Sequence, residues 1–416
     1  MLFIIADDLT GATDTGVQLS KKGYDTILFL NHINNSNNSS FVKVIDSETR
    51  ELSPVRAKER LRKILKDINF SSEDIIYKKI DSTLRGNIML EIKETMNITE
   101  RDLCIFTPAF PDNNRLVLGG YLLIENLLLG ESDYNNKDLE PSEISYIPDY
   151  LRMNSEISID LIDMKEVMKG PENLKLQINK LQRDQKQVII FDAINNKHLE
   201  NIIKGSQEIK RPLLFAGSAG LANHLTNLDT LKTSIDNFRI EKNASPFLMV
   251  IGSRRSIIDE QINYLKEKLE IEEVKIDIIK ILQNKEENFS VYINKVINCL
   301  NENKHVILRP RVNNNLIDLE FEEKKKEVKN ILGNITSNII KNMDVKNLLL
   351  SGGDTAIGVC QSVGINKLKI LQEILPGIPL SKAIDNKFNV ITKAGGFGDQ
   401  TTLYKIIMKL NNGGER

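Results

Sequence analysis

The chain has 416 residues, with 56 Lys and Arg against 57 Asp and Glu, which leaves a formal net charge of -1. This balance offers no electrostatic basis for binding nucleic acid or an anionic membrane, and no apolar run is long enough to cross a bilayer. The 3 cysteines lie far apart and fit neither a disulfide framework nor a zinc site, so we expect a protein of the reducing cytoplasm. The length of the chain predicts two or three domains.

In the first half of the chain, short apolar runs typical of buried strands alternate with segments of helical periodicity, which favours a parallel α/β architecture. Strands are expected at residues 2–6, 26–30, 42–46, 75–81, 103–109, 157–162, 187–192 and 212–217. Helices are expected at residues 13–22, 54–68, 87–96, 171–183 and 197–206. Residues 116–124 are interpreted as a hairpin or a strand, and residues 131–150 as a polar, irregular segment.

The apolar periodicity fades near residues 228–245 and restarts after Pro246. We therefore predict an N-terminal domain at 1–230, a linker at 231–245 and a C-terminal domain at 246–416. In the second domain, strands are expected at 247–251, 274–278, 305–309, 347–350, 368–374 and 389–392, and helices at 257–268, 289–300, 322–341, 356–363 and 402–410. The predicted fold class is α/β, with two domains that each contain a mainly parallel sheet flanked by helices.

The first candidate site follows the first strand. Asp7 and Asp8 stand at its carboxyl end, where open α/β sheets build their ligand sites, and Asp14 follows after several small residues. One of the two adjacent aspartates could be a helix N-cap. A cap accounts for one acid only, so the clustering of the three favours a functional site.

The second candidate site lies at residues 78–87, which close a strand and open a helix. A cap here, by Ser82 or Thr83, would be compatible with function, but capping requires neither Arg nor Lys together with Asp. Arg85 can grip a carboxylate through two hydrogen bonds, and Asp81 and Ser82 can bind sugar hydroxyls. Arg115, which follows a proline-rich strand exit, could point into the same cleft.

Turns of small residues follow several predicted strands. Residues 217–222 (GSAGLA) fit either an anion site at a helix N-terminus or close backbone packing. In the second domain, turns at 251–256, 351–356 and 393–399 each follow a strand. Together they indicate one sheet edge at which backbone N–H groups face an anion, although none matches a Walker P-loop or a GxGxxG fingerprint.

At these residues the sequence resembles the four-carbon acid sugar kinase family. The matching motifs are ADDLTGATD (6–14), KKIDSTLRG (78–86), TPAFP (107–111) with Arg115, GSAGLA (217–222), SGGDTA (351–356) and KAGGFGD (393–399). They occur in the family's order and span nearly the whole chain. The resemblance implies an N-terminal domain that binds an acid sugar, a C-terminal domain that binds ATP, and phosphorylation of the terminal hydroxyl of threonate, erythronate or a 3-oxo relative.

The resemblance also implies roles for individual residues. Asp7 and Asp8 are the candidate catalytic groups, either of which could accept the proton of the attacking hydroxyl. The candidate substrate-binding residues are Asp14, Lys79, Asp81, Ser82, Arg85 and Arg115. The candidate ATP-binding residues are Ser253, Gly352, Gly353, Asp354, Thr355 and a glycine of the last turn, Gly396 or Gly398. Mg²⁺ is expected to bridge the phosphates, with its protein ligands unassigned.

Two other functions are consistent with parts of the pattern. A haloacid-dehalogenase-like phosphatase also places an acid after an apolar strand, but it requires Asp-x-Asp, whereas Asp7 and Asp8 are adjacent. A non-enzymatic acid-sugar sensor could use the same clefts to signal to a partner, but no basic stripe or DNA-binding helix pair supports it. A small acid sugar and ATP are therefore the expected partners, without nucleic acid or membrane, and a homodimer is left open.

Overall fold

The computed structural model describes residues 1–30, 41–134, 141–153, 155–225, 242, 244–253, 255–283, 289–311, 321–386 and 388–413. The chain divides into two compact units, Met1–Thr233 and Ser234–Arg416. Most of the predicted linker at 231–245 lies outside the described residues. No helix within the described ranges is long and apolar enough to span a bilayer.

The first unit is built on a sheet whose described strands all pair in parallel. Its strand order is β2-β3-β1-β4-β11-β5-β10-β9. The bounds are β1 (Leu2–Ala6), β2 (Thr26–Phe29), β3 (Val42–Asp46), β4 (Ile75–Lys79), β5 (Cys104–Thr107), β9 (Ile159–Ile162), β10 (Val188–Phe191) and β11 (Leu214–Gly217). Most of the side chains in these strands are buried on both faces, as the continuous apolar runs predict.

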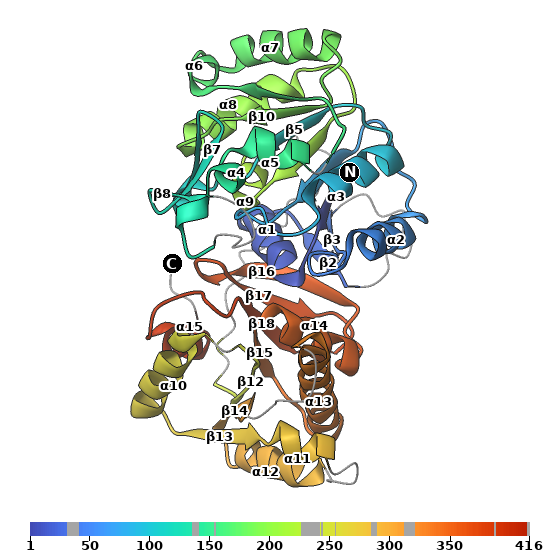
Figure 1. Ribbon diagram of the computed structural model, residues 1–416. Coiled ribbons are helices and arrows are strands. Elements are labelled where there is room, and N and C mark those ends of the chain that lie inside the picture. The colour runs from blue at the N-terminus through green and yellow to red at the C-terminus, as the bar shows by residue number, and fades with distance from the viewer. Residues whose placement is uncertain are drawn as a thin grey trace. The chain divides into compact units, whose positions relative to one another are not determined.

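Helices connect these strands, and several of them pack in pairs: α2 with α3, α7 with α8, and α1 with α9 (Figure 1). The bounds are α1 (Leu9–Lys21), α2 (Pro54–Leu65), α3 (Ile88–Thr99), α4 (Pro141–Ser145), α5 (Ile147–Met153), α6 (Met164–Val167), α7 (Pro171–Arg183), α8 (Asn196–Gln207) and α9 (Ala219–Ala222). A small antiparallel sheet contains β6 (Arg115–Leu118), β7 (Tyr121–Ile124) and β8 (Leu127–Leu128).

The second unit has a mixed sheet, in the order β13-β14-β12-β15-β18-β17-β16. β13, β14, β12, β15 and β18 are parallel, whereas β17 is antiparallel to both β18 and β16. The bounds are β12 (Phe247–Ile251), β13 (Ile271–Ile276), β14 (His305–Pro310), β15 (Asn347–Ser351), β16 (Lys367–Leu375), β17 (Ile378–Ala383) and β18 (Asn389–Lys393).

Helices flank both faces of this sheet, with α10 and α15 on one side and α13 and α14 on the other (Figure 1). A buried apolar cluster joins α10 and α15 to alternate residues of β12, β15 and β18. The bounds are α10 (Ser256–Lys268), α11 (Ile278–Gln283), α12 (Ser290–Asn301), α13 (Phe321–Asn342), α14 (Gly353–Val363) and α15 (Thr402–Asn412). The predicted α/β fold with mainly parallel sheets is confirmed.

Three local expectations need correction. The first helix begins at Leu9 rather than at residue 13, because Asp8 caps it. Residues 131–150 are not irregular throughout: α4 lies within them and α5 begins there, and both helices are too short to show a clear period. The strand β17 was not expected. It returns from β16 through a turn at Gly377, whose φ of 71° suits glycine.

Residues 116–124 form a hairpin rather than a single strand. β6 and β7 pair in antiparallel fashion, with Leu118 opposite Tyr121. Gly119 and Gly120 between them have φ values of 60° and 78°. Two consecutive residues with positive φ are typical of the two-residue turns that join antiparallel strands, so the glycine pair decides between the two alternatives.

Candidate functional site

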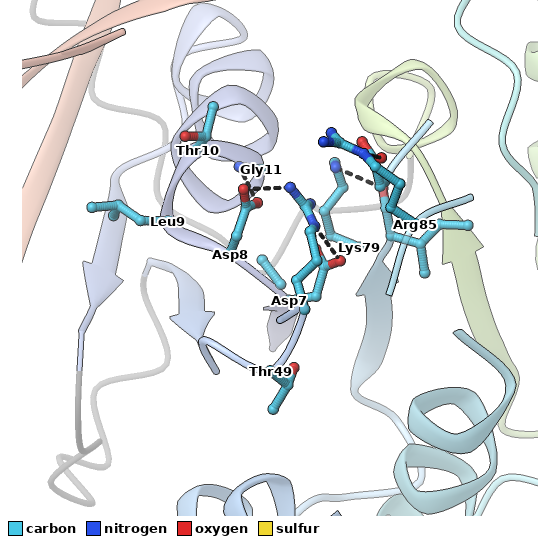
Figure 2. A network of polar contacts seen from close by, with 12 residues as sticks. Asp7, Asp8, Leu9, Thr10, Gly11, Thr49, Lys79 and Arg85 are labelled. Atoms are coloured by element: carbon cyan, nitrogen blue, oxygen red, sulfur yellow. Dashed lines mark hydrogen bonds and ion pairs between the residues drawn. The ribbon is translucent and has the colours of Figure 1, made fainter. Parts of the chain in front are cut away.

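The polar segments of the first unit meet where its strand order reverses. β1 lies between β3 and β4, so the chain moves to one side of β1 and later to the other. Ala6 is in register with both Asp46 and Lys79, which places the ends of three parallel strands at one edge. Ligand sites of open α/β sheets form at such points. Figure 2 shows Asp7, Asp8 and Lys79 turned toward one region, with Arg85 beside it.

Arg50, in the loop after β3, organises this edge. Its Nε and Nη2 each lie 2.8 Å from an oxygen of Asp7, and its Nη1 donates to Asp8. The backbone N–H groups of Thr49 and Arg50 also donate to the carbonyl of Asp7, at 2.9 and 3.1 Å. Burial raises the pKa of Asp7, but the charge and hydrogen bonds of Arg50 outweigh it and the net shift is downward. Asp7 is therefore a fixed, ionised partner of Arg50.

Sequence reasoning did not find Arg50. The signal was available, because residues 47–50 (SETR) follow the strand 42–46 as polar residues at the same edge as Asp7 and Asp8. The importance of Arg50 appears only when β3 is placed beside β1.

Asp8 is the more accessible of the two aspartates. Its side chain is 18% exposed, against 5% for Asp7. One carboxylate oxygen accepts from the Gly11 N–H at 2.7 Å, which makes Asp8 the N-cap of α1. Burial, and then the neighbouring charge of Asp7, raise the pKa of Asp8 in spite of Arg50. Asp8 is thus both a cap and a carboxylate of increased basicity at the edge of the cluster.

Lys79 and Gly11 complete the surroundings of Asp8. The buried Lys79 ammonium donates to the carbonyl of Ile80 at 2.7 Å. A Cβ built on Gly11 would lie 2.7 Å from an oxygen of Asp8 and 3.0 Å from Lys79 Nζ. A side chain at this position would therefore separate the carboxylate from the amide that it caps. The Gly11 amide is therefore committed to Asp8.

The loop after β4 holds a second ion pair. Asp81 accepts from Thr83 Oγ1 and from Arg85 Nε, each at 2.5 Å. Although burial raises it, the positive charges of Arg50 and Arg85 bring the pKa of Asp81 well below its usual range. The Arg85 side chain is 52% exposed. In the described part of the chain its two terminal nitrogens have no partner, so they can receive a carboxylate.

Neither Ser82 nor Thr83 caps a helix, contrary to one expectation. The N-cap of α3 is Asn87, which makes no side-chain cap bond. Its amide instead donates to the carbonyls of Thr49 and Leu52, at 3.1 and 2.9 Å. Asn87 therefore links the loop of Arg50 to the loop of Arg85. Ser82 is half-buried.

Two other predicted substrate residues lie further from these contacts. Asp14 is half-buried in the second turn of α1. Arg115 begins β6, where its guanidinium donates to the carbonyl of Asn113 and lies 5.5 Å from the ring centre of Tyr134. Its ion-pair contact is Glu125, at 3.9 Å. The structure brings Asp7, Asp8, Lys79, Asp81 and Arg85 together around Arg50, but places Arg115 among residues of the small sheet.

Further charges are buried behind the cluster. Lys78 pairs with Glu91 at 2.7 Å, with their side chains 0% and 2% exposed, and its charge also favours the ionised form of Asp7. Asp46 is fully buried, and one of its oxygens has no hydrogen-bond partner among the described residues. Burial, followed by the charges of Glu48 and Asp8, raises the pKa of Asp46 well above its usual range. These buried groups were not predicted.

In the second unit, three turns lie together where the strand order of its sheet reverses. Ser351 is in register with Ile251 on one side and Lys393 on the other, so β12, β15 and β18 end together. The strand order also reverses between β12 and β15. The turns that follow are those of Gly252, Gly352 and Gly395, and all three were singled out in the sequence.

We call Gly252, Ser253, Gly352, Thr355 and Gly395 the glycine cluster. A Cβ built on Gly252 would lie 1.9 Å from Thr355 Oγ1, and one built on Gly395 would lie 2.1 Å from Ser253 Oγ. Gly352 has a φ of 104° and a built Cβ 3.5 Å from Ser253 N. Side chains at these glycines would fill or distort the cluster. These glycines therefore allow the three turns to pack closely together beside the N-terminus of α14.

The remaining predicted nucleotide residues lie next to this cluster. Gly353 and Asp354 form the first turn of α14, and Asp354 is exposed. Gly398 has a φ of 81°, and a Cβ built on it would lie 2.1 Å from Thr402 Oγ1. A Cβ built on Gly396 would meet no atom within 4 Å, and its φ lies outside the left-handed region. Local structure thus explains the glycine at 398 but not the one at 396.

The GSAGLA segment is explained by packing. A Cβ built on Gly217 would lie 2.3 Å from the carbonyl of Thr107, and one built on Gly220 would lie 2.6 Å from the carbonyl of Ala109. Ser218 donates to that same carbonyl of Ala109 at 2.7 Å. These glycines allow α9 to approach the strand exit at 107–111. Of the two open interpretations, close backbone packing accounts for this motif.

Two family models match the chain. One, described as a sugar-binding N-terminal domain, matches residues 2–225, and the other, described as a nucleotide-binding C-terminal domain, matches residues 248–403. The first contains the cluster around Arg50, and the second contains the glycine cluster.

Curated relatives align along nearly the whole chain. A D-threonate kinase of Salmonella typhimurium is 29% identical over 417 residues, which cover 97% of this chain and 96% of the relative. A D-erythronate kinase of Heliobacterium modesticaldum is 25% identical, with 98% of both chains covered. A 3-oxo-tetronate kinase of Haemophilus influenzae is 24% identical, with 96% of this chain and 97% of the relative covered.

Solved structures share the fold. A Salmonella typhimurium LT2 protein superposes with a TM-score of 0.80 at 22% identity, covering 97% of this chain and 98% of that chain. The Haemophilus influenzae protein HI1011 superposes with a TM-score of 0.75 at 23% identity, covering 98% of this chain and all of that chain. At this identity the similarity supports the architecture alone.

Proposed function

Because this chain belongs to the four-carbon acid sugar kinase family, whose members join a sugar-binding N-terminal domain to a nucleotide-binding C-terminal domain, we propose that it transfers the terminal phosphoryl group of ATP to a hydroxyl of a four-carbon acid sugar. The observation that carries this proposal is a pair of sites of complementary character. One joins carboxylates to an accessible arginine, and the other is a set of glycine turns at a helix N-terminus, each where the strand order of its own sheet reverses.

In the proposed acid-sugar site, Arg85 binds the substrate carboxylate. Arg50 is committed to Asp7 and Asp8, whereas the two terminal nitrogens of Arg85 are available for a bidentate contact. Lys79 adds positive charge near Asp8. Asp81, Ser82, Asp14 and Arg115 remain candidates for the hydroxyls and for the rim of the site.

Asp8 is the group that we assign to the attacking hydroxyl. Its carboxylate is more exposed than that of Asp7, and its raised pKa makes it the better proton acceptor. Arg50 and the Gly11 amide hold it in one orientation. Phosphoryl transfer depends chiefly on such positioning and on charge stabilisation, so an oriented carboxylate beside the hydroxyl is sufficient to align the nucleophile.

The glycine cluster is the proposed phosphate site for ATP. Backbone N–H groups at the N-terminus of α14 and at the turns of Ser253 and Gly396 would face the phosphates. Mg²⁺ commonly binds through substrate phosphates, water and one or two carboxylates. The exposed Asp354 fits that requirement and is the carboxylate that we assign to it. The metal would neutralise charge on the phosphates.

The proposed reaction also assigns a task to each part of the chain. Residues 1–230 would bind the acid sugar, residues 231–245 would link the domains, and residues 246–416 would bind ATP. Transfer requires the two substrates to meet, so we propose that the domains close on them during turnover. Closure would also exclude water, which would otherwise hydrolyse ATP.

The test is release of ADP in the presence of D-threonate, D-erythronate, 3-oxo-tetronate and longer aldonic acids, each supplied separately with ATP and Mg²⁺. The proposal expects ADP release that depends on one of the four-carbon acids, and formation of one phosphorylated acid per ADP. Release of phosphate from a phosphorylated acid without nucleotide would indicate the phosphatase instead. Tight binding of an acid with no ADP release would indicate the sensor.

A further inference from the structure

Lys393, the last residue of β18, is a buried cation without an acidic partner in the described part of the chain. Its side chain is nearly inaccessible, with the residue 2% exposed. Its ammonium donates to the carbonyls of Ala394 and Gly395, at 3.1 and 3.3 Å, and to no carboxylate. A buried charge that lacks a counter-charge is costly, so such groups are usually paired, neutralised or reserved for a ligand. Burial lowers the pKa of Lys393 to about 8.

This lysine lies directly at the glycine cluster. β18 pairs with β15, with Lys393 opposite Ser351, and the Gly352 N–H donates to the Lys393 carbonyl at 3.0 Å. Gly395, whose carbonyl accepts from the ammonium, packs against Ser253. The hydroxyl of Ser351 is also buried and has no hydrogen-bond partner among the described residues.

The two carbonyl contacts have a geometric consequence. In a trans peptide the C=O and the following N–H point in opposite directions. Since the ammonium attracts the carbonyls of Ala394 and Gly395, the amides of Gly395 and Gly396 are turned away from it. Neither amide has a hydrogen-bond partner in the described ranges. These two unpartnered amides therefore lie on the side of the turn away from the ammonium, where an anion could accept from them.

We propose that Lys393 is a positioning residue of the nucleotide site: by holding the Ala394 and Gly395 carbonyls, it fixes the turn whose unpartnered amides, those of Gly395 and Gly396, contact a phosphate of the bound nucleotide, and the charge of that phosphate acts on the buried ammonium across the turn. This inference rests on the proposed function and deepens it. It also explains Gly396, because a side chain there would occupy the space in front of the two amides.

The charged groups on neighbouring segments are Arg255 before α10, Asp354 on α14, and Asp399 and Lys405 around the start of α15. Asp399 pairs with Lys405 at 3.2 Å, and neither it nor Asp354 forms an ion pair with Lys393. A bound phosphate would therefore be the principal counter-charge of the ammonium. Its binding would favour the protonated lysine, so affinity should fall once the free protein loses that proton.

The experiment measures binding to the full chain by calorimetry without metal, with ADP and tripolyphosphate as the anionic probes and adenosine as the neutral one. For the wild type, affinity for both anions should fall about tenfold between pH 7 and pH 9, while that for adenosine stays level. Lys393→Met should bind both anions at least tenfold more weakly at pH 7 and lose this pH dependence. Lys409→Met is the matched control, since Lys409 also donates to a carbonyl, that of Ile374 at 2.8 Å, but is exposed.

The inference is overturned if Lys393→Met binds ADP and tripolyphosphate as tightly as the wild type, or if wild-type affinity for the anions is the same at pH 7 and pH 9. The pH series needs no variant, so it decides the matter even if Lys393→Met does not fold. Failure of the wild type to bind either anion at any pH would overturn the proposed nucleotide site together with this inference. Normal wild-type binding with an unaffected variant would overturn the inference alone.

Discussion

At the residue scale, two adjacent carboxylates follow one strand and have different environments. Asp7 accepts two hydrogen bonds from Arg50 and has a lowered pKa, whereas Asp8 is more exposed and has a raised pKa. Consecutive residues after a strand point in different directions, so one lies against Arg50 and the other reaches the edge of the site. We therefore assign a structural role to Asp7 and a catalytic role to Asp8.

Asp8→Asn should lower the turnover number by roughly two to four orders of magnitude, because an amide cannot accept the proton of the hydroxyl. Asparagine caps helices as well as aspartate does, so α1 and the fold should be retained. Steady-state kinetics with the preferred acid gives the turnover, and calorimetry with ADP should give unchanged affinity. Asp102→Asn, at an exposed aspartate before β5, is the control. Turnover of Asp8→Asn within tenfold of the wild type would contradict the assigned role.

Arg85→Ala should raise the KM for the acid sugar by roughly 10- to 100-fold, which corresponds to loss of one charged hydrogen-bonding contact. ADP affinity should be unchanged, since Arg85 belongs to the first unit. Arg115→Ala, measured in parallel, tests the sequence-based assignment of Arg115 to the same acid-sugar site. An unchanged KM in Arg85→Ala would require another cation to bind the substrate.

Asp46→Asn should stabilise the protein at neutral pH by roughly 1 kcal/mol, because it replaces a buried acid that has an unpartnered oxygen. The folded state raises the pKa of Asp46, so it retains a proton that the unfolded chain releases near pH 4. The contribution of Asp46 to stability is therefore present below that pH and is lost as the pH rises toward the folded-state pKa. Urea unfolding should show a larger gain at pH 8 than at pH 5. A loss of stability at pH 8 would show that the ionised carboxylate is required.

At the element scale, the last turn contains one glycine that the backbone conformation requires and one that it does not require. Gly398 has a positive φ and no room for a Cβ, while Gly396 has neither restriction. The same distinction applies to GSAGLA, where close contacts with the strand exit account for both Gly217 and Gly220. A glycine motif indicates a ligand only where the fold itself does not require glycine.

Gly398→Ala should destabilise the protein by roughly 1–2 kcal/mol, because alanine is strained at positive φ and would contact Thr402. Gly396→Ala should leave stability within about 0.5 kcal/mol of the wild type but weaken ADP binding about tenfold or more. Thermal unfolding and calorimetry measure the two effects. If Gly396→Ala binds ADP normally, the space beside Gly396 does not accommodate the nucleotide.

At the scale of the whole molecule, the two units repeat one construction principle. In each, parallel strands end together where the strand order reverses, and polar residues or glycines follow those strands. The first unit gathers charged side chains at this point, and the second gathers glycine turns at the N-terminus of a helix. The division fits a substrate with hydroxyls and one carboxylate in the first unit and a polyphosphate in the second.

Hydrogen exchange on the full chain tests this division. ADP should slow exchange at the amides of residues 252–253, 352–355 and 395–398, and the acid sugar should slow exchange at residues 7–11, 49–50 and 79–86. Each ligand binds and orders its own segments, so the two sets should not overlap when only one ligand is present. If the acid sugar alone slowed exchange at residues 252–253, 352–355 and 395–398, the assignment of one ligand to each domain would be contradicted.

The amino-acid sequence by itself determined the α/β class, most strands and helices, and the motifs that converge in each unit. It could do so because buried parallel strands are continuous apolar runs, and because residues such as Gly352 and Asp7 directly follow them. The resemblance based on these motifs is confirmed by the family models.

Only the tertiary structure decided which of these residues act together. Arg50 and Asn87 join segments that are distant in sequence, and the partners of Lys393 are carbonyls that no side-chain pattern encodes. It also distinguished Gly396 from Gly398, and Asp7 from Asp8, although the two members of each pair are the same amino acid. The physical reason is that burial, pairing and backbone orientation depend on which strands lie side by side, and strand order is a property of the whole sheet.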